Sequence, residues 1–141
     1  MPIIGTNFIK IDAERKDTAS RNLRINNNLG ISKIEDMNLS LGASRQDGLK
    51  FIFEYTVLYE PDAAHMKLTG EVLFIDDAKV IKEIKQQWKD KKPVKEDIMT
   101  AVMNSALTKS AIKALQMSQD LGLPAPIKLP RVTKKEEAQK T

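Results

Sequence analysis

Hydrophobic and polar residues alternate along the first half of the chain, which predicts β-strands. In residues 8–16, Ile9, Ile11 and Ala13 alternate with charged side chains, the period of two expected for a strand with one solvated face. Residues 23–34 alternate more loosely, and the three asparagines at 26–28 favour a bulge or a turn over the alternative that they hydrogen-bond a ligand. We therefore expect a strand over 8–16 and a less regular strand over 23–34.

The clearest strand signal covers residues 49–75 and predicts a long hairpin. Pro61 and Asp62 lie at its centre and supply turn residues, because proline fixes φ and aspartate can bond to the backbone. The residues expected to share one apolar face are Leu49, Phe51, Phe53, Tyr55, Val57 and Tyr59 on the first strand and Met66, Leu68, Gly70, Val72 and Phe74 on the second.

Residues 35–48 lie between the second and third expected strands and mix acidic, small and scattered apolar side chains. Such a mixture predicts a long connection, and a long connection in a small domain is often functional. Its large apolar residues are Met37, Leu39 and Leu41.

After residue 75 the hydrophobic period becomes helical, so the second half predicts two helices. Asp76 and Asp77 can cap a first helix over 78–90, which Lys91, Lys92 and Pro93 end. A second helix over 94–121 carries a broad apolar stripe, and Gly122 is its expected stop. Three prolines make 123–132 extended, and residues 133–141 are predicted to be disordered. The stripe includes Ile98, Met99, Val102, Met103, Ala106, Leu107, Ala111, Ala114 and Leu115.

Four strands followed by two helices, without βαβ alternation, predict an α+β fold. We expect one four-stranded antiparallel sheet with two C-terminal helices packed on one face. The expected domain is 1–132, with a charged tail at 133–141.

Composition narrows the possible chemistry. The chain has 141 residues, no cysteine and one histidine, His65. It therefore lacks disulfides, thiolate zinc sites and cysteine nucleophiles, and we expect no metal, no cofactor and no enzymatic activity. The proportions of charged residues (30%) and hydrophobic residues (41%) argue against global disorder and against a membrane protein. The first residues do not resemble a signal peptide, so we expect a cytoplasmic protein without membrane insertion.

The few polar residues that suggest chemistry each have a simpler structural interpretation. His65 fits an exposed or structural position near a turn, and the Asp76-Asp77 pair fits a helix start better than a metal site. Glu54 and Glu71 lie on the two hairpin strands and form a carboxylate pair only if the register brings them together. A small-molecule or enzymatic role in the sheet–helix cleft therefore ranks third among the functional hypotheses.

The net charge of +4 is unevenly distributed. Residues 79–95 hold seven lysines against two acidic residues, a local charge of +5, whereas 49–75 carry −2. A solvated helix face explains the lysines, since arginine and interleaved aromatic residues are missing apart from Trp88. RNA or ribosome association remains the alternative, through Lys79, Lys82, Lys85, Lys89 and Lys92 together with the basic tail.

The second predicted helix has an apolar arc broad enough to contact more than one surface. Three of the six methionines, Met99, Met103 and Met117, lie on it, and methionine suits adaptable binding surfaces. A sheet–helix core and a surface for oligomerisation or apolar-peptide binding both remain open for this stripe.

In element order and hydrophobic pattern, residues 8–132 resemble the SecB family of export chaperones. The matching features are four antiparallel strands ending in a long hairpin, a first helix, a long second helix and the extended segment Leu123-Pro124-Ala125-Pro126 onward. The family is acidic and often binds zinc through its tail, whereas this chain is basic and residues 133–141 hold no ligand of that type.

The resemblance implies an ATP-independent holdase that binds unfolded polypeptide clients and assembles as a homo-oligomer, a dimer or tetramer. It places the crossover loop of the family at 35–48, between strands two and three, above an apolar groove. The implied oligomer interface uses an outer strand and the long helix, at Ile9, Ile11, Val102 and Ala106. The implied client-binding residues are Met37, Leu39, Leu41, Phe51, Phe53, Tyr55, Met99 and Met103.

Overall fold

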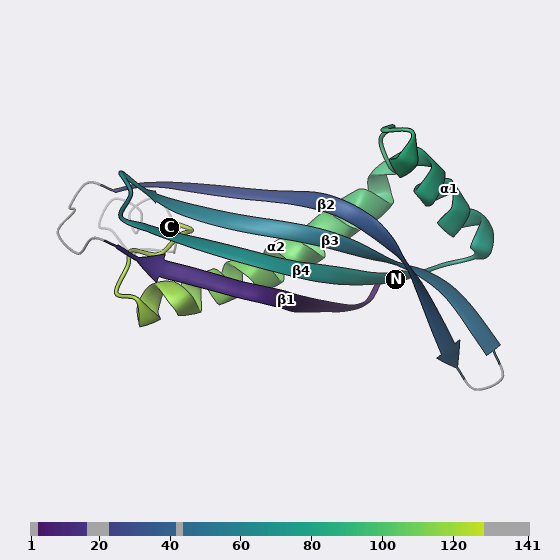
Figure 1. Ribbon diagram of the computed structural model, residues 1–141, viewed down its shortest axis with the longest axis horizontal. Helices are drawn as coiled ribbons and strands as arrows, with labels where there is room; N and C mark the ends of the chain where they lie inside the picture. The colour runs from purple at the N-terminus through teal and green to yellow at the C-terminus, as the bar shows by residue number, and fades with distance from the viewer. Residues whose placement is uncertain (1–2, 17–22, 42–43, 129–141) are drawn as a thin grey trace, which may run out of the picture.

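A computed structural model describes residues 3–16, 23–41 and 44–128, which form four strands and then two helices (Figure 1). This confirms the α+β class and the element order. The predicted tail at 133–141 lies outside the described residues. The elements are β1 (Ile3–Arg15), β2 (Arg24–Leu41), β3 (Ser44–Glu60), β4 (Ala64–Ile75), α1 (Ala78–Lys89) and α2 (Glu96–Asp120).

The strands form one antiparallel sheet in the order β1-β4-β3-β2. β2, β3 and β4 follow one another as hairpins, so each lies beside its neighbour in sequence. β1 instead pairs with β4, and β2 lies at the opposite edge. The connection that crosses between the two edges therefore joins β1 to β2, and the expectation of a crossover between strands two and three was wrong.

The expected long connection over 35–48 is also wrong, because most of it is paired strand. β2 continues to Leu41 and pairs with β3 down to the pair Leu41–Ser44. β4 ends at Ile75, opposite Gly48, so the end of this hairpin extends beyond the sheet as a two-stranded ribbon (Figure 1). Acidic and small residues weaken the strand signal here, but each strand satisfies the backbone groups of the other. Sequence alone does not reveal such a partner.

The apolar face predicted for the hairpin is confirmed. The side chains of Leu49, Phe51, Phe53, Tyr55, Val57 and Tyr59 are at most 1% exposed, as are those of Met66, Leu68, Val72 and Phe74. α2 runs behind this face and contacts all four strands (Figure 1). Ile81 and Ile84 of α1 join one end of the same core, together with Val94. Both helices therefore cover one face of the sheet.

Local details at the strand and helix ends differ from the sequence expectations in two places. The asparagines at 26–28 pair regularly with β3, and the register shift of β2 falls between Ile31 and Lys33 instead. Asp77 occupies the N-cap of α1, but its side chain makes no capping hydrogen bond. In the described part of the chain, neither helix combines the length and apolar character needed to cross a membrane.

Gly122 ends α2 as expected. It has a φ of +66°, and Leu123 N–H donates to the Ser118 carbonyl at 2.7 Å while Gly122 N–H donates to Gln119 at 3.2 Å. This pair of bonds is the Schellman arrangement, in which a left-handed residue reverses the chain after a helix. The reversal directs the following residues back toward the sheet.

Gly70 of β4 lies where the sheet has no room for a side chain. A Cβ atom at this position would lie within 2.7 Å of two Phe53 ring atoms and of the Asn7 carbonyl oxygen. Phe8 pairs with Gly70 from β1, and its ring meets the Phe53 ring edge-on at 6.4 Å. The absence of a side chain at Gly70 therefore allows the aromatic rings of two strands to pack over a third.

We predict that Gly70→Ala lowers the free energy of unfolding by about 1–3 kcal/mol, because Phe53 must leave its position in a closely packed core. Gly30→Ala on β2 is the matched control, since a Cβ there meets no atom within 4 Å. Urea unfolding followed by circular dichroism measures both. Equal midpoints for the two variants would contradict the packing described here.

Candidate functional site

The face of α2 that lies against the sheet is built from small residues. Ala106, Ser110, Ala114 and Ser118 recur at every fourth position and are all buried, and Val102 begins the same line. Residues four apart lie on one side of a helix. Their small side chains let the helix approach the large aromatic residues of β3 closely. The sheet thus contributes the large side chains of the core, and the small residues of the helix leave room for them.

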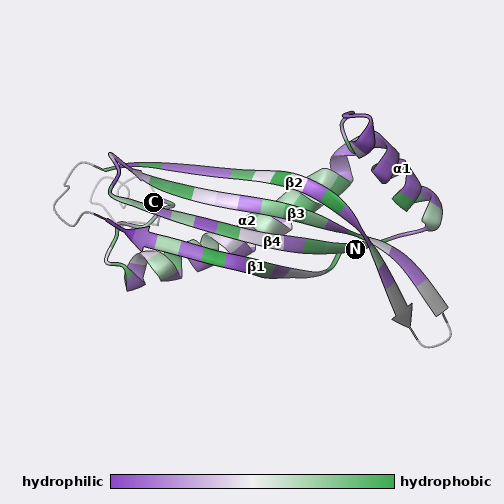
Figure 2. Ribbon diagram, viewed as in Figure 1, coloured by the Kyte–Doolittle hydropathy of each residue, from purple (hydrophilic) through white to green (hydrophobic). Residues whose placement is uncertain are grey.

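As a consequence, several large apolar residues of α2 point away from the sheet. Ile112 is 55% exposed and Leu107 is 43% exposed. Lys109 is the only charged residue among the exposed positions between Thr100 and Gln119. The exposed positions of α1, in contrast, include Lys79, Lys82, Glu83, Lys85 and Lys89, and Figure 2 shows this difference in hydropathy between the helices. The outer face of α2 is therefore unusually poor in charge.

β1 continues this apolar surface along the edge of the sheet. Ile9 is 58% exposed and Ile11 is 47% exposed, and Ile9 lies at a register shift of the strand. β1 pairs only with β4, so its outer backbone groups have no strand partner in the described chain. An unpaired strand edge is a ready site for pairing with another chain.

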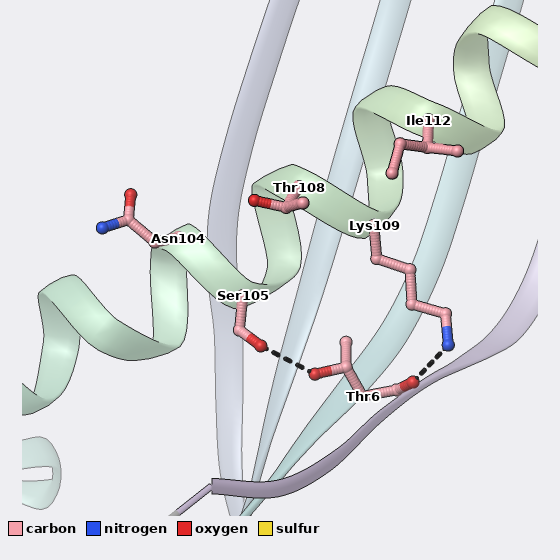
Figure 3. A pocket seen from close by; sticks show the side chains of 6 residues that line it. All are labelled: Thr6, Asn104, Ser105, Thr108, Lys109 and Ile112. Atoms are coloured by element: carbon pink, nitrogen blue, oxygen red, sulfur yellow. Dashed lines mark hydrogen bonds between the residues drawn. The ribbon is translucent and has the colours of Figure 1, made fainter. Parts of the chain in front are cut away.

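Hydrogen bonds fix β1 beside α2. The hydroxyl groups of Thr6 and Ser105 lie 3.0 Å apart, and Lys109 Nζ donates to the Thr6 carbonyl at 2.5 Å (Figure 3). At the other end of the strand, Arg15 donates to the Leu121 carbonyl at 2.6 Å. Thr6, Asn104, Ser105, Thr108, Lys109 and Ile112 line a shallow, open depression between the two elements. We call the exposed residues Ile9, Ile11 and Ile112 with this depression the α2–β1 surface.

A second feature lies on the helix side of the sheet, where three polar side chains interrupt the apolar face. Tyr55 donates its hydroxyl hydrogen to Asn27 Oδ1 at 3.0 Å, which orients the amide so that Nδ2 donates to the Pro126 carbonyl at 2.8 Å. Tyr59 donates to the Pro124 carbonyl at 2.7 Å. We call Asn27, Tyr55 and Tyr59 the cradle. It holds the segment that follows α2.

The predicted client-binding residues do not form one open groove in the described chain. Phe51, Phe53 and Tyr55 are core residues, and Met99 packs against the same core. Met37 is buried, with its methyl group only 2.7 Å from where a Gly48 Cβ would lie. Met103 is half-buried. Leu39 and Leu41 lie on β2, and their side chains are outside the described part of the structure.

The predicted oligomer-interface residues divide into two groups. Ile9 and Ile11 are exposed on the edge strand, whereas Val102 and Ala106 are fully buried against the sheet of their own chain. Leu107 and Ile112 are the residues of α2 that combine size, apolarity and exposure. The clue in the sequence is the scarcity of charge from Thr100 to Gln119, where Lys109 and Lys113 are the only charged residues.

The lysines of the nucleic-acid alternative lie on and beyond α1. Lys79, Lys82, Lys85, Lys89 and Lys92 are all exposed, and Lys85 forms an ion pair with Asp36 of β2 at 2.7 Å. Trp88 is half-buried and lines two open depressions together with lysines of this group. The lysine cluster therefore surrounds one aromatic side chain.

The remaining polar candidates have local partners. His65 Nε2 lies 3.6 Å from Asp12 Oδ2 across β1 and β4. Glu54 lies 3.7 Å from Lys67, and Glu71 accepts a hydrogen bond from Asn7. The two glutamates thus have different partners, and the register does not set them directly opposite each other. Comparison of the chain with protein-family models, curated proteins and solved structures returned no match.

Burial changes the acidity of the cradle tyrosines. It raises the pKa of Tyr55, and burial together with the neighbouring Tyr55 raises the pKa of Tyr59 to about 12. Both hydroxyl groups therefore keep the hydrogen that they donate throughout the neutral range. Asn27 belongs to the asparagine triplet whose ligand-binding role the sequence ranked below a bulge, and Tyr59 was not singled out as a binding group.

We predict that the free energy of unfolding falls as the pH rises from 10 to 12. Raising the pKa of Tyr59 from its ordinary value of 10.0 to about 12 means that the folded protein favours the protonated hydroxyl group. The resulting stabilisation is complete below pH 10 and is lost as the hydroxyl group of the folded protein deprotonates. The full loss corresponds to about 3 kcal/mol. Urea unfolding at each pH measures it, with Tyr59→Phe as the reference for other titrating groups. Parallel decreases in both proteins would contradict the assignment to Tyr59.

Proposed function

We propose that this protein is a SecB-like holdase that assembles from copies of itself and binds unfolded polypeptides without ATP. The observation that carries the proposal is the arrangement of α2, which buries its small residues against the sheet and leaves Leu107 and Ile112 exposed. The exposed positions from Thr100 to Gln119 are otherwise polar and include one charged residue, Lys109, so these two large apolar side chains mark a candidate contact surface. A second copy of the chain is the natural cover, because the unpaired edge of β1 lies beside it.

The length of the α2–β1 surface suits an extended contact with a second copy. A helix of 25 residues is about 37 Å long, and a strand of 13 residues is about 43 Å long. A helix is about 10 Å wide and a strand about 5 Å wide, so the two together offer roughly 600 Å². This area approaches the roughly 800 Å² that a stable protein–protein interface buries on each partner.

The chemistry of a holdase matches the functional groups on this chain. Holding many different sequences requires apolar surface and main-chain hydrogen bonds, and does not require a shaped polar pocket. The depressions between β1 and α2 and around Trp88 are open and shallow. The cradle donates hydrogen bonds to main-chain carbonyls. These features support binding of polypeptide by its backbone and apolar side chains.

We predict that Ile112→Glu dissociates the assembly. A symmetric interface would bury two copies of the introduced charge, and a buried unpaired charge costs several kcal/mol. Light scattering after size exclusion gives the mass, which we expect to be a multiple of the chain mass for the wild type and the chain mass for the variant. Ala78→Glu, which adds the same charge at an exposed end of α1, is the control. A monomeric wild type would contradict the proposed assembly.

We also predict that the wild-type protein suppresses the aggregation of a heat-unfolded test protein in the absence of nucleotide. Turbidity at 360 nm measures the suppression, which we expect at near-equimolar concentrations because each client segment needs one binding surface. Addition of ATP should leave it unchanged. If the protein assembles but does not suppress aggregation, the proposed oligomer stands and the proposed holdase function is contradicted.

RNA or ribosome association is the second candidate, supported by the exposed lysines around Trp88. If it operates, binding to a single-stranded RNA should weaken steeply between 50 and 200 mM salt, because each neutralised phosphate releases a counterion. Lys82→Glu with Lys89→Glu should abolish such binding and leave the oligomer intact. Lys85 is less suitable for the test because Asp36 already pairs with it.

A further inference from the structure

Residues 123–128 run across the helix side of the sheet, without regular secondary structure and with a bend at Pro126 and Ile127. Leu123 packs against the core cluster that contains Tyr55 and Tyr59, and Pro126 is buried. Ile25 and Leu29 of β2 border the same cluster. The segment thus packs on apolar side chains beside the end of α2, with the cradle as its polar groups. We call this surface the channel.

The cradle recognises this segment through the main chain alone. Tyr59 binds the carbonyl of Pro124, and Asn27 binds the carbonyl of Pro126. Both contacts use only carbonyl oxygens, so they are available to any polypeptide whose main chain follows the same path, whatever its side chains.

The cradle is also organised in advance of binding. Tyr55 is 1% exposed, and its hydrogen bond to Asn27 fixes which end of the amide acts as donor. A donor whose orientation is set by the core loses little freedom when it binds a carbonyl. This arrangement belongs to a binding site more than to a simple chain anchor.

We propose that the cradle binds the main chain of extended, apolar segments of unfolded polypeptides, and that residues 123–128 occupy it in the free protein as an internal substitute. The inference rests on the proposed holdase function and gives it a location. Clients then compete with a tethered segment. The measured affinity is therefore the intrinsic affinity multiplied by the fraction of molecules in which the channel is free. The α2–β1 surface remains free for assembly.

The test removes the internal substitute while keeping the cradle intact. Pro126→Asp places a charge at the buried position of the segment, whereas Pro124→Asp places the same charge at an exposed position. The probe is fluorescently labelled α-lactalbumin, reduced and carboxymethylated so that it stays unfolded. We expect Pro126→Asp to bind it about tenfold more tightly than the wild type. Pro124→Asp should bind like the wild type.

A second pair of measurements identifies the channel as the location. Adding Asn27→Ala and Tyr59→Phe to Pro126→Asp should reverse the gain in affinity, because these changes remove both carbonyl donors. A capped peptide with the sequence of residues 121–128 should compete with the labelled probe on Pro126→Asp. Circular dichroism and urea unfolding confirm that each variant is folded before its binding is compared.

The outcomes separate this inference from the proposed function. If the wild type binds the probe and folded Pro126→Asp binds it equally or more weakly, the holdase function stands and the internal substitute is overturned. Binding by Pro126→Asp alone supports the inference, since the wild-type channel is then closed. If neither protein binds the probe, both proposals are overturned.

Discussion

The close contact between α2 and the aromatic face of the sheet determines most of the structure. β3 and β4 supply phenylalanine, tyrosine, leucine and methionine side chains that would prevent a bulky helix from approaching. The helix can still approach because small residues recur at every fourth position of its inner side, namely Ala106, Ser110, Ala114 and Ser118. Gly70 plays the same part within the sheet, where it allows Phe53 to lie over β4. Large side chains on the sheet and small side chains on the helix together produce a densely packed core.

This division of size also explains why large apolar residues lie on the outside of α2. Once the inward positions are reserved for small residues, larger apolar residues on the helix can only lie at its flanks or on its outer face. Ile112 and Leu107 are there, and Lys109 is the one charged residue among the exposed positions from Thr100 to Gln119. The core of one chain and the proposed contact with the next are therefore two results of one packing constraint.

Sequence patterns predicted the strands, the helices and the buried face of the hairpin because each depends on a local period. They failed at 35–48, where strand formation depends on pairing between two weak segments rather than on either alone. The family resemblance also assigned Val102 and Ala106 to an interface, whereas both are buried against the sheet of their own chain, because a one-dimensional stripe does not show which side of a helix its own sheet will cover. The cradle could not be predicted as a unit, because Asn27, Tyr59 and Pro126 meet only after β2, β3 and the segment beyond α2 have packed together.

The position of β1 in the sheet has a consequence for how the chain folds. β2, β3 and β4 are hairpin neighbours, so their pairing closes only short loops. β1 must wait for β4, because its partners lie far along the chain, from Arg15 with Ala64 to Ile3 with Phe74. Closing long loops is slow. β1 precedes the other three strands along the chain and is thus among the last of them to be secured. Until β4 has been synthesised, β1 remains an unpaired strand that carries apolar side chains.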